Sequence, residues 1–246
     1  LQVKKNPYLA AYRRKRASRK PENTEREFVL RLIEQMIDVD DAAEPLKKAV
    51  INIRKLPTDQ EVQREACYAL AYKAIAQGQD VINNGGLEAV LDAMNRHLDC
   101  ERLQFDGCEM LWRLAMDEDG AQSVIDAGGI AAVLSAIDSH KESVRLQEEA
   151  CGALRWLAKR DAKAVMDAGG LEAVVQIMTS YPQFSWVQMW ACGAISNFAE
   201  VDARRVQELG GFYKVKDAMK QYGNCPEVQR LGMEAMQLDP EKRKRL

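Results

Sequence analysis

Residues 165–178 read VMDAGGLEAVVQIM, one of four copies of a pattern that decides the fold of this chain. The other copies are VINNGGLEAVLDAM (81–94), VIDAGGIAAVLSAI (124–137) and VQELGGFYKVKDAM (206–219), and their opening valines lie 43, 41 and 41 residues apart. A fixed period of about forty residues indicates stacked supersecondary units, none of which buries its apolar face alone. The chain is therefore expected to form one continuous array.

Each copy contains a short apolar segment followed by a pair of glycines, and the spacing after the glycines predicts an amphipathic helix. After Gly85–Gly86, the apolar residues Leu87, Val90, Leu91 and Met94 have the spacing of a buried helical stripe. Glycine allows a positive φ and a close backbone approach, so one helix can stop and the next can start at a steep angle. A phosphate-binding loop would need a preceding strand and further glycines. The pairs are therefore interpreted as turns, as are Gly128–Gly129, Gly169–Gly170 and Gly210–Gly211.

A second motif runs in phase with the first. It reads REACYALAYKA (64–74), FDGCEMLWRLA (105–115), EEACGALRWLA (148–158), MWACGAISNFA (189–199) and, more weakly, RLGMEAMQLDP (230–240). One position of this motif is occupied in turn by Cys67, Cys108, Cys151, Cys192 and Met233, each preceded by Ala or Gly. This position is expected to be the tightest contact of a long helix with its neighbours.

Together the two motifs resemble the armadillo-repeat family, over about residues 43–239. The family unit is a short first helix, two glycines or Gly-Ala, a second helix, a loop and a longer third helix. The resemblance implies an all-α fold, a right-handed α-solenoid of about five repeats with atypical terminal ones. HEAT repeats are the near alternative, which the doubled glycines disfavour.

Charge and helical spacing divide the chain further. Residues 1–23 are expected to be a basic N-terminal arm, 24–42 an N-terminal capping helix, 43–239 the solenoid and 240–246 a basic C-terminal tail. In the capping helix, Phe28, Leu32, Ile33 and Met36 are expected on one buried side. The arm carries eight basic residues and no acidic residue within positions 1–20: Lys4, Lys5, Arg13, Arg14, Lys15, Arg16, Arg19 and Lys20.

The remaining 226 residues hold 27 basic and 37 acidic side chains, a net charge of −10. A nucleic-acid contact is therefore compatible with the arm only, and not with the acidic remainder of the chain. No run of about eighteen apolar residues is present, so no membrane-spanning segment is expected.

Cysteine and histidine usage argues against a metal site. Four cysteines share one helical position, Cys100 and Cys225 have no CxxC partner, and the only histidines are His97 and His140. Zinc binding needs these residue types clustered at short spacing. No metal or cofactor is therefore expected, and the thiols are interpreted as free and buried. The expected location is an intracellular, reducing compartment: the cytoplasm first, with the nucleus or an organelle, after removal of a targeting segment, as alternatives.

The resemblance also implies a binding groove lined by the third helices, where family members hold extended peptides. In nuclear-import adaptors of the family, a Trp and, four residues later, an Asn recur on each third helix. Here the Trp position reads Tyr68, Glu109, Gly152, Gly193 and Glu234, and the Asn position reads Tyr72, Arg113, Trp156, Asn197 and Leu238. Only Asn197 matches, so an import adaptor is a secondary alternative.

Aromatic and arginine side chains dominate binding hot spots, and several recur on successive third helices. The candidate groove residues are Arg64, Tyr68, Tyr72, Phe105, Glu109, Trp112, Arg113, Glu148, Arg155, Trp156, Met189 and Asn197. Trp186 and Trp190 are expected in the core instead.

No catalytic motif is recognisable in the sequence, so an enzyme is not expected. The predicted function is a protein-interaction scaffold, a subunit of a larger complex, that binds a protein segment in the groove and docks through its basic arm. The alternative is an RNA- or ribosome-associated solenoid that uses the arm.

Overall fold

The computed structural model describes residues 24–38 and 43–240, and every regular element in these ranges is a helix. The helices are α2 (Thr24–Asp38), α3 (Ala43–Ile53), α4 (Gln60–Asn83), α5 (Gly86–Arg96), α6 (Glu101–Ala115), α7 (Glu118–Asp126), α8 (Gly129–Ser139), α9 (Val144–Asp167), α10 (Gly170–Ser180), α11 (Ser185–Glu208), α12 (Gly211–Gln221) and α13 (Pro226–Gln237). The expected all-α class is confirmed. The eight arm residues and the tail from residue 241 lie outside the described residues.

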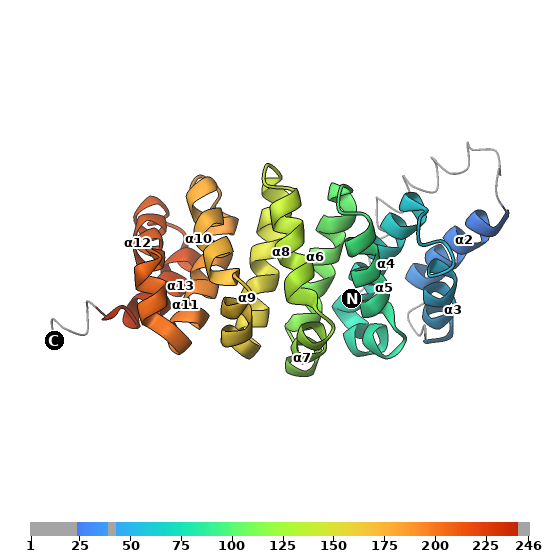
Figure 1. Cartoon of the computed structure of the whole chain (residues 1–246), viewed down its shortest axis with the longest axis horizontal. Helices are drawn as coiled ribbons and strands as arrows, with labels where there is room; N and C mark the ends of the chain where they lie inside the picture. Colours follow the sequence, from blue (N-terminus) through green and yellow to red (C-terminus); the bar gives the residue numbers. More distant parts are fainter. Residues whose placement is uncertain (1–23, 39–42, 241–246) are drawn as a thin grey trace.

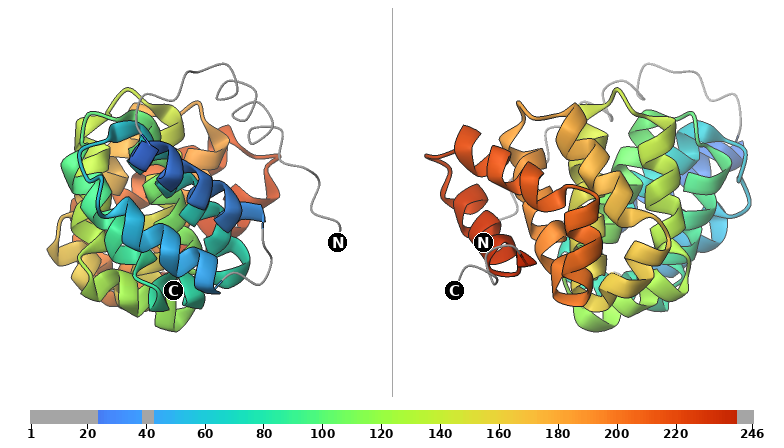
Figure 2. Two further views of the ribbon diagram at one scale, coloured as in Figure 1. Left: turned by 90° about the vertical axis from the view of Figure 1, so that its right-hand side faces the viewer. Right: turned by 60° about the vertical axis from the view of Figure 1, so that its left-hand side comes forward.

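The helices lie in two layers along one long axis (Figure 1). One layer contains the long helices α4, α6, α9, α11 and α13, each in contact with the next. The other contains α3, α5, α8, α10 and α12, which contact one another in the same order. Figure 2 shows that the units follow one another in sequence order from one end of the stack to the other.

A break separates the long part of α4, α9 and α11, and the whole of α6, from the short helical segment that follows. Within α9 the backbone leaves helical geometry at Asp161 (φ −145°, ψ 82°), and within α11 at Asp202 (φ −145°, ψ 79°). The Asp161 carboxylate accepts a 2.9 Å hydrogen bond from Ala164 N, and Asp202 accepts one of 3.0 Å from Arg205 N. Each aspartate therefore caps the next short helical segment.

The two glycines of each pair are needed for different reasons. Gly169 has φ of +97°, a left-handed conformation that other residues adopt at a cost. Gly170 is helical, but a Cβ there would lie 2.8 Å from the backbone oxygen of Val165 and still closer to its side chain. The other three pairs repeat this geometry, so the interpretation of the glycines as turns is confirmed.

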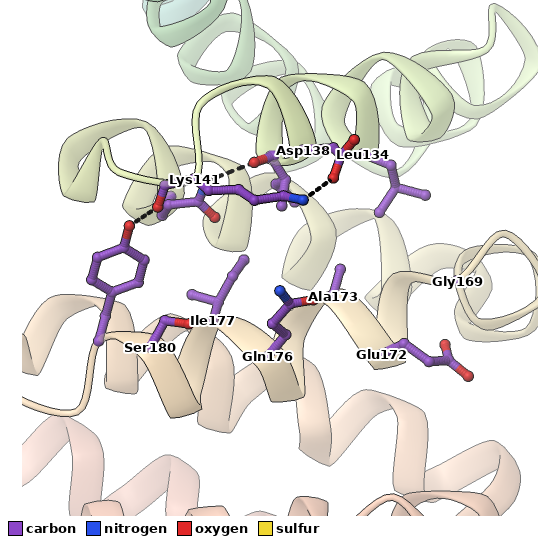
Figure 3. Close-up of a pocket in the computed structure, with 12 residues that line it drawn as sticks. Leu134, Asp138, Lys141, Gly169, Glu172, Ala173, Gln176, Ile177 and Ser180 are labelled. Carbon is purple, nitrogen blue, oxygen red and sulfur yellow. Dashed lines mark hydrogen bonds and ion pairs between the residues drawn. The ribbon is translucent and has the colours of Figure 1, made fainter.

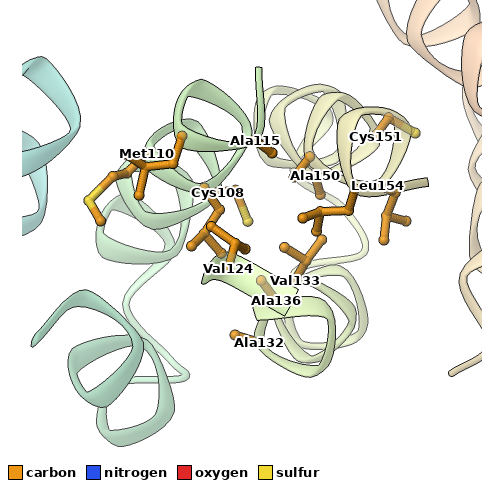
Figure 4. Packing of buried hydrophobic residues seen from close by; sticks show 14 of the residues in the cluster. Cys108, Met110, Ala115, Val124, Ala132, Val133, Ala136, Ala150, Cys151 and Leu154 are labelled. Carbon is orange, nitrogen blue, oxygen red and sulfur yellow. The ribbon is translucent and has the colours of Figure 1, made fainter. Parts of the chain in front are cut away.

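Apolar side chains of the two layers meet in a continuous core. Between α6, α7, α8 and α9, for example, Cys108, Val124, Val133 and Leu154 converge (Figure 4). Cys67, Cys108, Cys151 and Cys192 are buried free thiols, as expected. Burial raises the pKa of Cys151 and Cys192 to about 12, so both stay protonated at neutral pH.

Two expectations about buried residues are wrong. Met233 occupies the cysteine position but is 53% exposed, because no described long helix lies beyond α13 to cover it. In α2, Phe28 is 54% exposed, and the buried residues are Val29, Leu30, Leu32, Ile33 and Met36. The buried side begins one residue later than predicted because α2 packs on both α3 and α4.

A row of glutamines, which the motif comparison did not reveal, joins the layers. Gln147 Nε2 donates to Ile137 O at 3.0 Å and to His140 O at 3.1 Å. The amide therefore pairs Ile137 O at the end of α8 and adds a second bond to His140 O, which also accepts from Ser143 N. The same two bonds, to the carbonyls ten and seven residues earlier, are made by Gln63, Gln104, Gln188 and Gln229. The identical offset of these glutamines from the cysteine position was the available signal.

A second row links each unit to the one before it. His97 Nε2 lies 2.9 Å from Pro57 O, and His140 Nε2 lies 2.7 Å from Leu98 O. A carbonyl only accepts, so this ring nitrogen carries the proton in both histidines. Tyr181 and Tyr222 occupy the same position and donate their hydroxyls to Lys141 O and Pro182 O. Each histidine therefore forms a hydrogen bond that joins its unit to the preceding unit.

Candidate functional site

The two-layer arrangement leaves one face of the long helices uncovered, here called the long-helix face. Six half-buried or exposed side chains from α6, α9 and α11 form a continuous row on it, the Trp–cation ladder: Arg113, Trp112, Trp190, Arg155, Trp156 and Lys159. Neighbouring members are 5.0 to 6.0 Å apart, measured to ring centroids. These distances are those of aromatic and cation–π contacts.

Two glycines lie beneath the ladder, and one of them makes room for it. A Cβ at Gly152 would lie 3.8 Å from the rings of both Trp112 and Trp190, an ordinary van der Waals distance. At Gly193 a Cβ would come within 2.7 Å of Arg155 Cδ, and nearer still to Nε. The position where import adaptors carry Trp is therefore covered here by side chains of the adjacent helices.

Arg155 differs from the other half-buried arginines of this face, Arg64, Arg102 and Arg113, in having no carboxylate partner among the described residues. Arg113 pairs with Glu109 at 2.5 Å, and Arg230 pairs with Glu234 at 2.8 Å. Burial and then the charge of Arg230 lower the pKa of Arg155, while Glu234 opposes this effect. Arg155 nevertheless stays charged at neutral pH, because a guanidinium is effectively always protonated in proteins.

Trp112 is tied to the acidic part of the face. Its Nε1 donates to Glu149 Oε2 at 2.5 Å, which orients the indole in the ladder. Burial raises the pKa of Glu149 to about 7; the bond from Trp112 opposes this, and the charges of Glu109 and Glu148 add to it. Glu149 therefore titrates near neutral pH.

A shorter row lies toward α4. Arg102 stands 5.8 Å from the Tyr68 ring centroid and 5.2 Å from that of Phe105, and Arg145 lies 5.0 Å from Phe105 on α6. Arg102 Nε also donates to Asp106 Oδ2 at 2.9 Å. Burial raises the pKa of Asp106 to about 7, against the lowering effect of Arg102, and Asp106 Oδ1 has no hydrogen-bond partner.

The predicted groove residues on α4, α6 and α9 all lie on this face or beside it. Tyr68, Phe105, Trp112, Arg113, Arg155 and Trp156 belong to the two rows. The others are half-buried, namely Arg64 (paired with Glu65 at 2.7 Å), Tyr72, Glu109 and Glu148.

Two predicted groove residues on α11 are not free to bind. Met189 is only 6% exposed and belongs to the core, because its turn of α11 faces the neighbouring helices. Asn197 is half-buried, and its Nδ2 donates to Arg155 O at 2.8 Å. Its amide hydrogen bond therefore ties α11 to α9.

The expectation that Trp186 and Trp190 lie in the core is wrong. Trp186 is 60% exposed, and Trp190 is half-buried in the ladder. The two lie four residues apart, on one side of α11. Counted from the cysteine, Trp186 holds the position of Arg102 and Arg145, and this shared offset was the signal that would have placed it.

Cavities open on the opposite layer. One of about 240 Å³ lies between α8 and α10 and is lined by Asp138, Lys141, Glu172 and Tyr181, among others (Figure 3). A similar one of about 280 Å³ lies between α3 and α5. Their equivalent positions mark gaps between successive helices of that layer. Within residues 24–38 and 43–240, no three His, Cys, Asp or Glu side chains group as metal ligands.

None of the described helices is long and apolar enough by itself to cross a membrane; α7 and α8, bent by 73°, meet those criteria of length and composition only as a pair.

Comparisons with known proteins show the fold. No protein-family model matches the chain, and no curated protein matches it. The chain is similar to the crystal structure of an engineered protein, a Northeast Structural Genomics Consortium target, with 25% identity over 91% of this chain and 95% of that one and a TM-score of 0.71. A second engineered target of that consortium has 26% identity over 91% and 93% of the two chains and a TM-score of 0.70. The likeness is therefore one of overall helical architecture.

Proposed function

We propose that this chain is a right-handed α-solenoid of the armadillo type and acts as a non-enzymatic protein-interaction scaffold within a larger assembly. The three-helix units, the positive φ of the first glycine and the close approach at the second support this repeat type. The bound partner is a protein segment laid across the long-helix face, and residues 1–23 form a second docking element. The free thiols agree with a reducing compartment.

The Trp–cation ladder is the observation that carries this proposal. Tryptophan and arginine are the side chains most enriched in binding hot spots. Each ring of the ladder is already held by its neighbours, so a partner would meet a preorganised surface and little side-chain entropy would be lost on binding. The exposed indole of Trp186 lies one helical turn from Trp190 and extends the same surface.

The mode of binding differs from that of the import adaptors. In those relatives the recurring Asn holds the peptide, whereas here the Asn197 amide donates to Arg155 O. The only matching residue of that pattern is therefore engaged within the chain. A scaffold whose affinity comes from indoles and cations fits the described residues better.

Affinity capture from the native source tests the proposal. The wild-type chain is compared with Trp156→Ala plus Arg113→Ala on the long-helix face and with Tyr213→Ala, an exposed aromatic on the opposite layer, as the matched control. We expect the double variant to lose a specific protein that the control retains, while circular dichroism shows all three folded. Capture of the same proteins by all three chains would contradict the proposal.

Two further capture experiments distinguish binding through the arm, or to RNA, from binding through the long-helix face. Deletion of residues 1–23 should weaken docking into the assembly if the arm contributes. Binding that disappears steeply with salt and with ribonuclease treatment would instead favour the RNA-associated alternative, because phosphate contacts release counterions.

A further inference from the structure

The Arg155 guanidinium is a half-buried charge whose described neighbours are the Trp156 and Trp190 rings, at 5.3 and 5.2 Å to their centroids. No carboxylate or carbonyl among the described residues accepts a hydrogen bond from it. On the same face, Arg64, Arg113 and Arg230 each have a carboxylate at 2.5 to 2.8 Å. Because a half-buried charge without a counter-charge costs free energy, the arrangement indicates an external anion.

The geometry holds this guanidinium in one place. Its stem lies on Gly193, where a Cβ would come within 2.7 Å of Arg155 Cδ. Its own backbone carbonyl accepts the hydrogen bond from Asn197. Ring contacts leave the N–H groups in the guanidinium plane, and these match the two oxygens of a carboxylate.

The charges of the long-helix face differ along its length. Toward α4 and α6, Glu65, Asp106 and Glu109 are paired with Arg64, Arg102 and Arg113, and at the beginning of α9 Glu148 and Glu149 lie near Arg145 and Arg113. Around Arg155 lie Lys159 and Arg230, and Glu234 is already paired with Arg230. A single carboxylate on a peptide is enough to supply the counter-charge that Arg155 lacks.

Resting on the proposed function, we infer that Arg155, Trp156 and Trp190 form a subsite for an Asp or Glu side chain of the bound protein segment. The carboxylate accepts from the Arg155 guanidinium, and the two indoles contact its methylene groups and the apolar side chain next to it. The preferred segment is therefore an acidic residue beside an apolar one.

A random-peptide phage library panned on the full chain tests this inference. Wild type should select peptides with Asp or Glu enriched several-fold at one aligned position. Arg155→Gln should lose that enrichment and keep the apolar preference, whereas Arg205→Gln, whose residue pairs with Glu172 of α10 at 2.8 Å and lies outside the ladder, should keep both. Thermal melting confirms that the variants are folded.

A second measurement does not depend on any variant of the chain. A selected peptide and its Glu→Gln or Asp→Asn form are titrated against wild type. We expect the neutral form to bind about tenfold more weakly, as for loss of a charge-assisted hydrogen bond. Equal affinity of the two forms, or selected peptides without acidic enrichment, would overturn the inference.

The outcomes separate this inference from the proposed function. Peptides that need Trp156 and Trp190 but show no acidic preference leave the scaffold proposal standing and remove the Arg155 subsite. A library that yields no peptide, or only peptides that bind Trp156→Ala and Trp190→Ala as tightly as wild type, counts against both.

Discussion

Arg155 lies on the backbone of Gly193, so closely that a Cβ at position 193 would approach Arg155 Cδ to 2.7 Å. At Gly170 the missing Cβ faces a backbone atom instead, the oxygen of Val165, at 2.8 Å. A flexible side chain can move away from a new methyl group, whereas a backbone carbonyl within a turn cannot. A methyl group can therefore be accommodated at Gly193 but not at Gly170.

The first prediction compares Gly193→Ala with Gly170→Ala. We expect Gly193→Ala to leave the free energy of unfolding unchanged or raise it by up to about 1 kcal/mol, since Ala is the better helix former. It should also shift the tryptophan fluorescence, because Arg155 leaves Trp190. Gly170→Ala should lower the free energy of unfolding by about 2 kcal/mol through overpacking. Urea unfolding measures both, and equal effects of the two substitutions would contradict this explanation.

The second prediction concerns the glutamine row. Gln147→Ala removes both hydrogen bonds to Ile137 O and His140 O and leaves Ile137 O without a partner, while His140 O keeps its hydrogen bond from Ser143 N. We expect the free energy of unfolding to fall by about 1 to 3 kcal/mol. Gln176→Ala, at an exposed position of α10, is the control and should change it by less than about 0.5 kcal/mol. A loss as small as that of the control would mean that the row is dispensable.

The third prediction concerns pH. The pKa values of Asp106 and Glu149 are raised to about 7, chiefly by burial, above their values of about 4 in an unfolded chain. Between these values the folded chain keeps protons that the unfolded chain releases. The free energy of unfolding contributed by both groups should therefore fall as pH rises from about 4 to about 7.

Asp106→Asn isolates the contribution of one group to this pH dependence. It keeps the size of the side chain and removes the buried charge, so stability at pH 8 should rise relative to wild type and the dependence should flatten. Urea unfolding at several pH values measures both quantities. An unchanged pH dependence in the variant would show that Asp106 does not titrate in this window.

The fourth prediction separates the two tryptophans of α11. Trp190 packs on Trp112 with centroids 6.0 Å apart, whereas Trp186 is mostly exposed. Trp190→Ala should lower the free energy of unfolding by about 2 to 3 kcal/mol, and Trp186→Ala by less than about 0.5 kcal/mol. Both should weaken partner binding. Thermal unfolding gives the comparison, and a larger loss for Trp186→Ala would place that residue in the core after all.

Much of the local structure could be predicted from the chain itself. The glycine pairs, the apolar spacing after them and the buried cysteines all follow from contacts between residues near in sequence or at one fixed period. The misplaced residues were Phe28, Met189, Trp186, Trp190 and Met233. In each of them the decisive fact was which neighbouring helix covers the residue, and helical periodicity alone does not contain that information.

The sequence by itself determined the helical unit and its period, because a glycine with positive φ and an i, i+3, i+4 stripe are local requirements of the backbone and of burial. Only the tertiary structure decided which side chains meet on the long-helix face. Trp112 and Trp190 come from α6 and α11 and meet above the α9 residue Gly152, with ring centroids 6.0 Å apart. The packing of α9 against α11 also places the Arg155 guanidinium beside the Trp156 and Trp190 rings and away from any carboxylate partner among the described residues. The sequence of α9 alone does not contain that information.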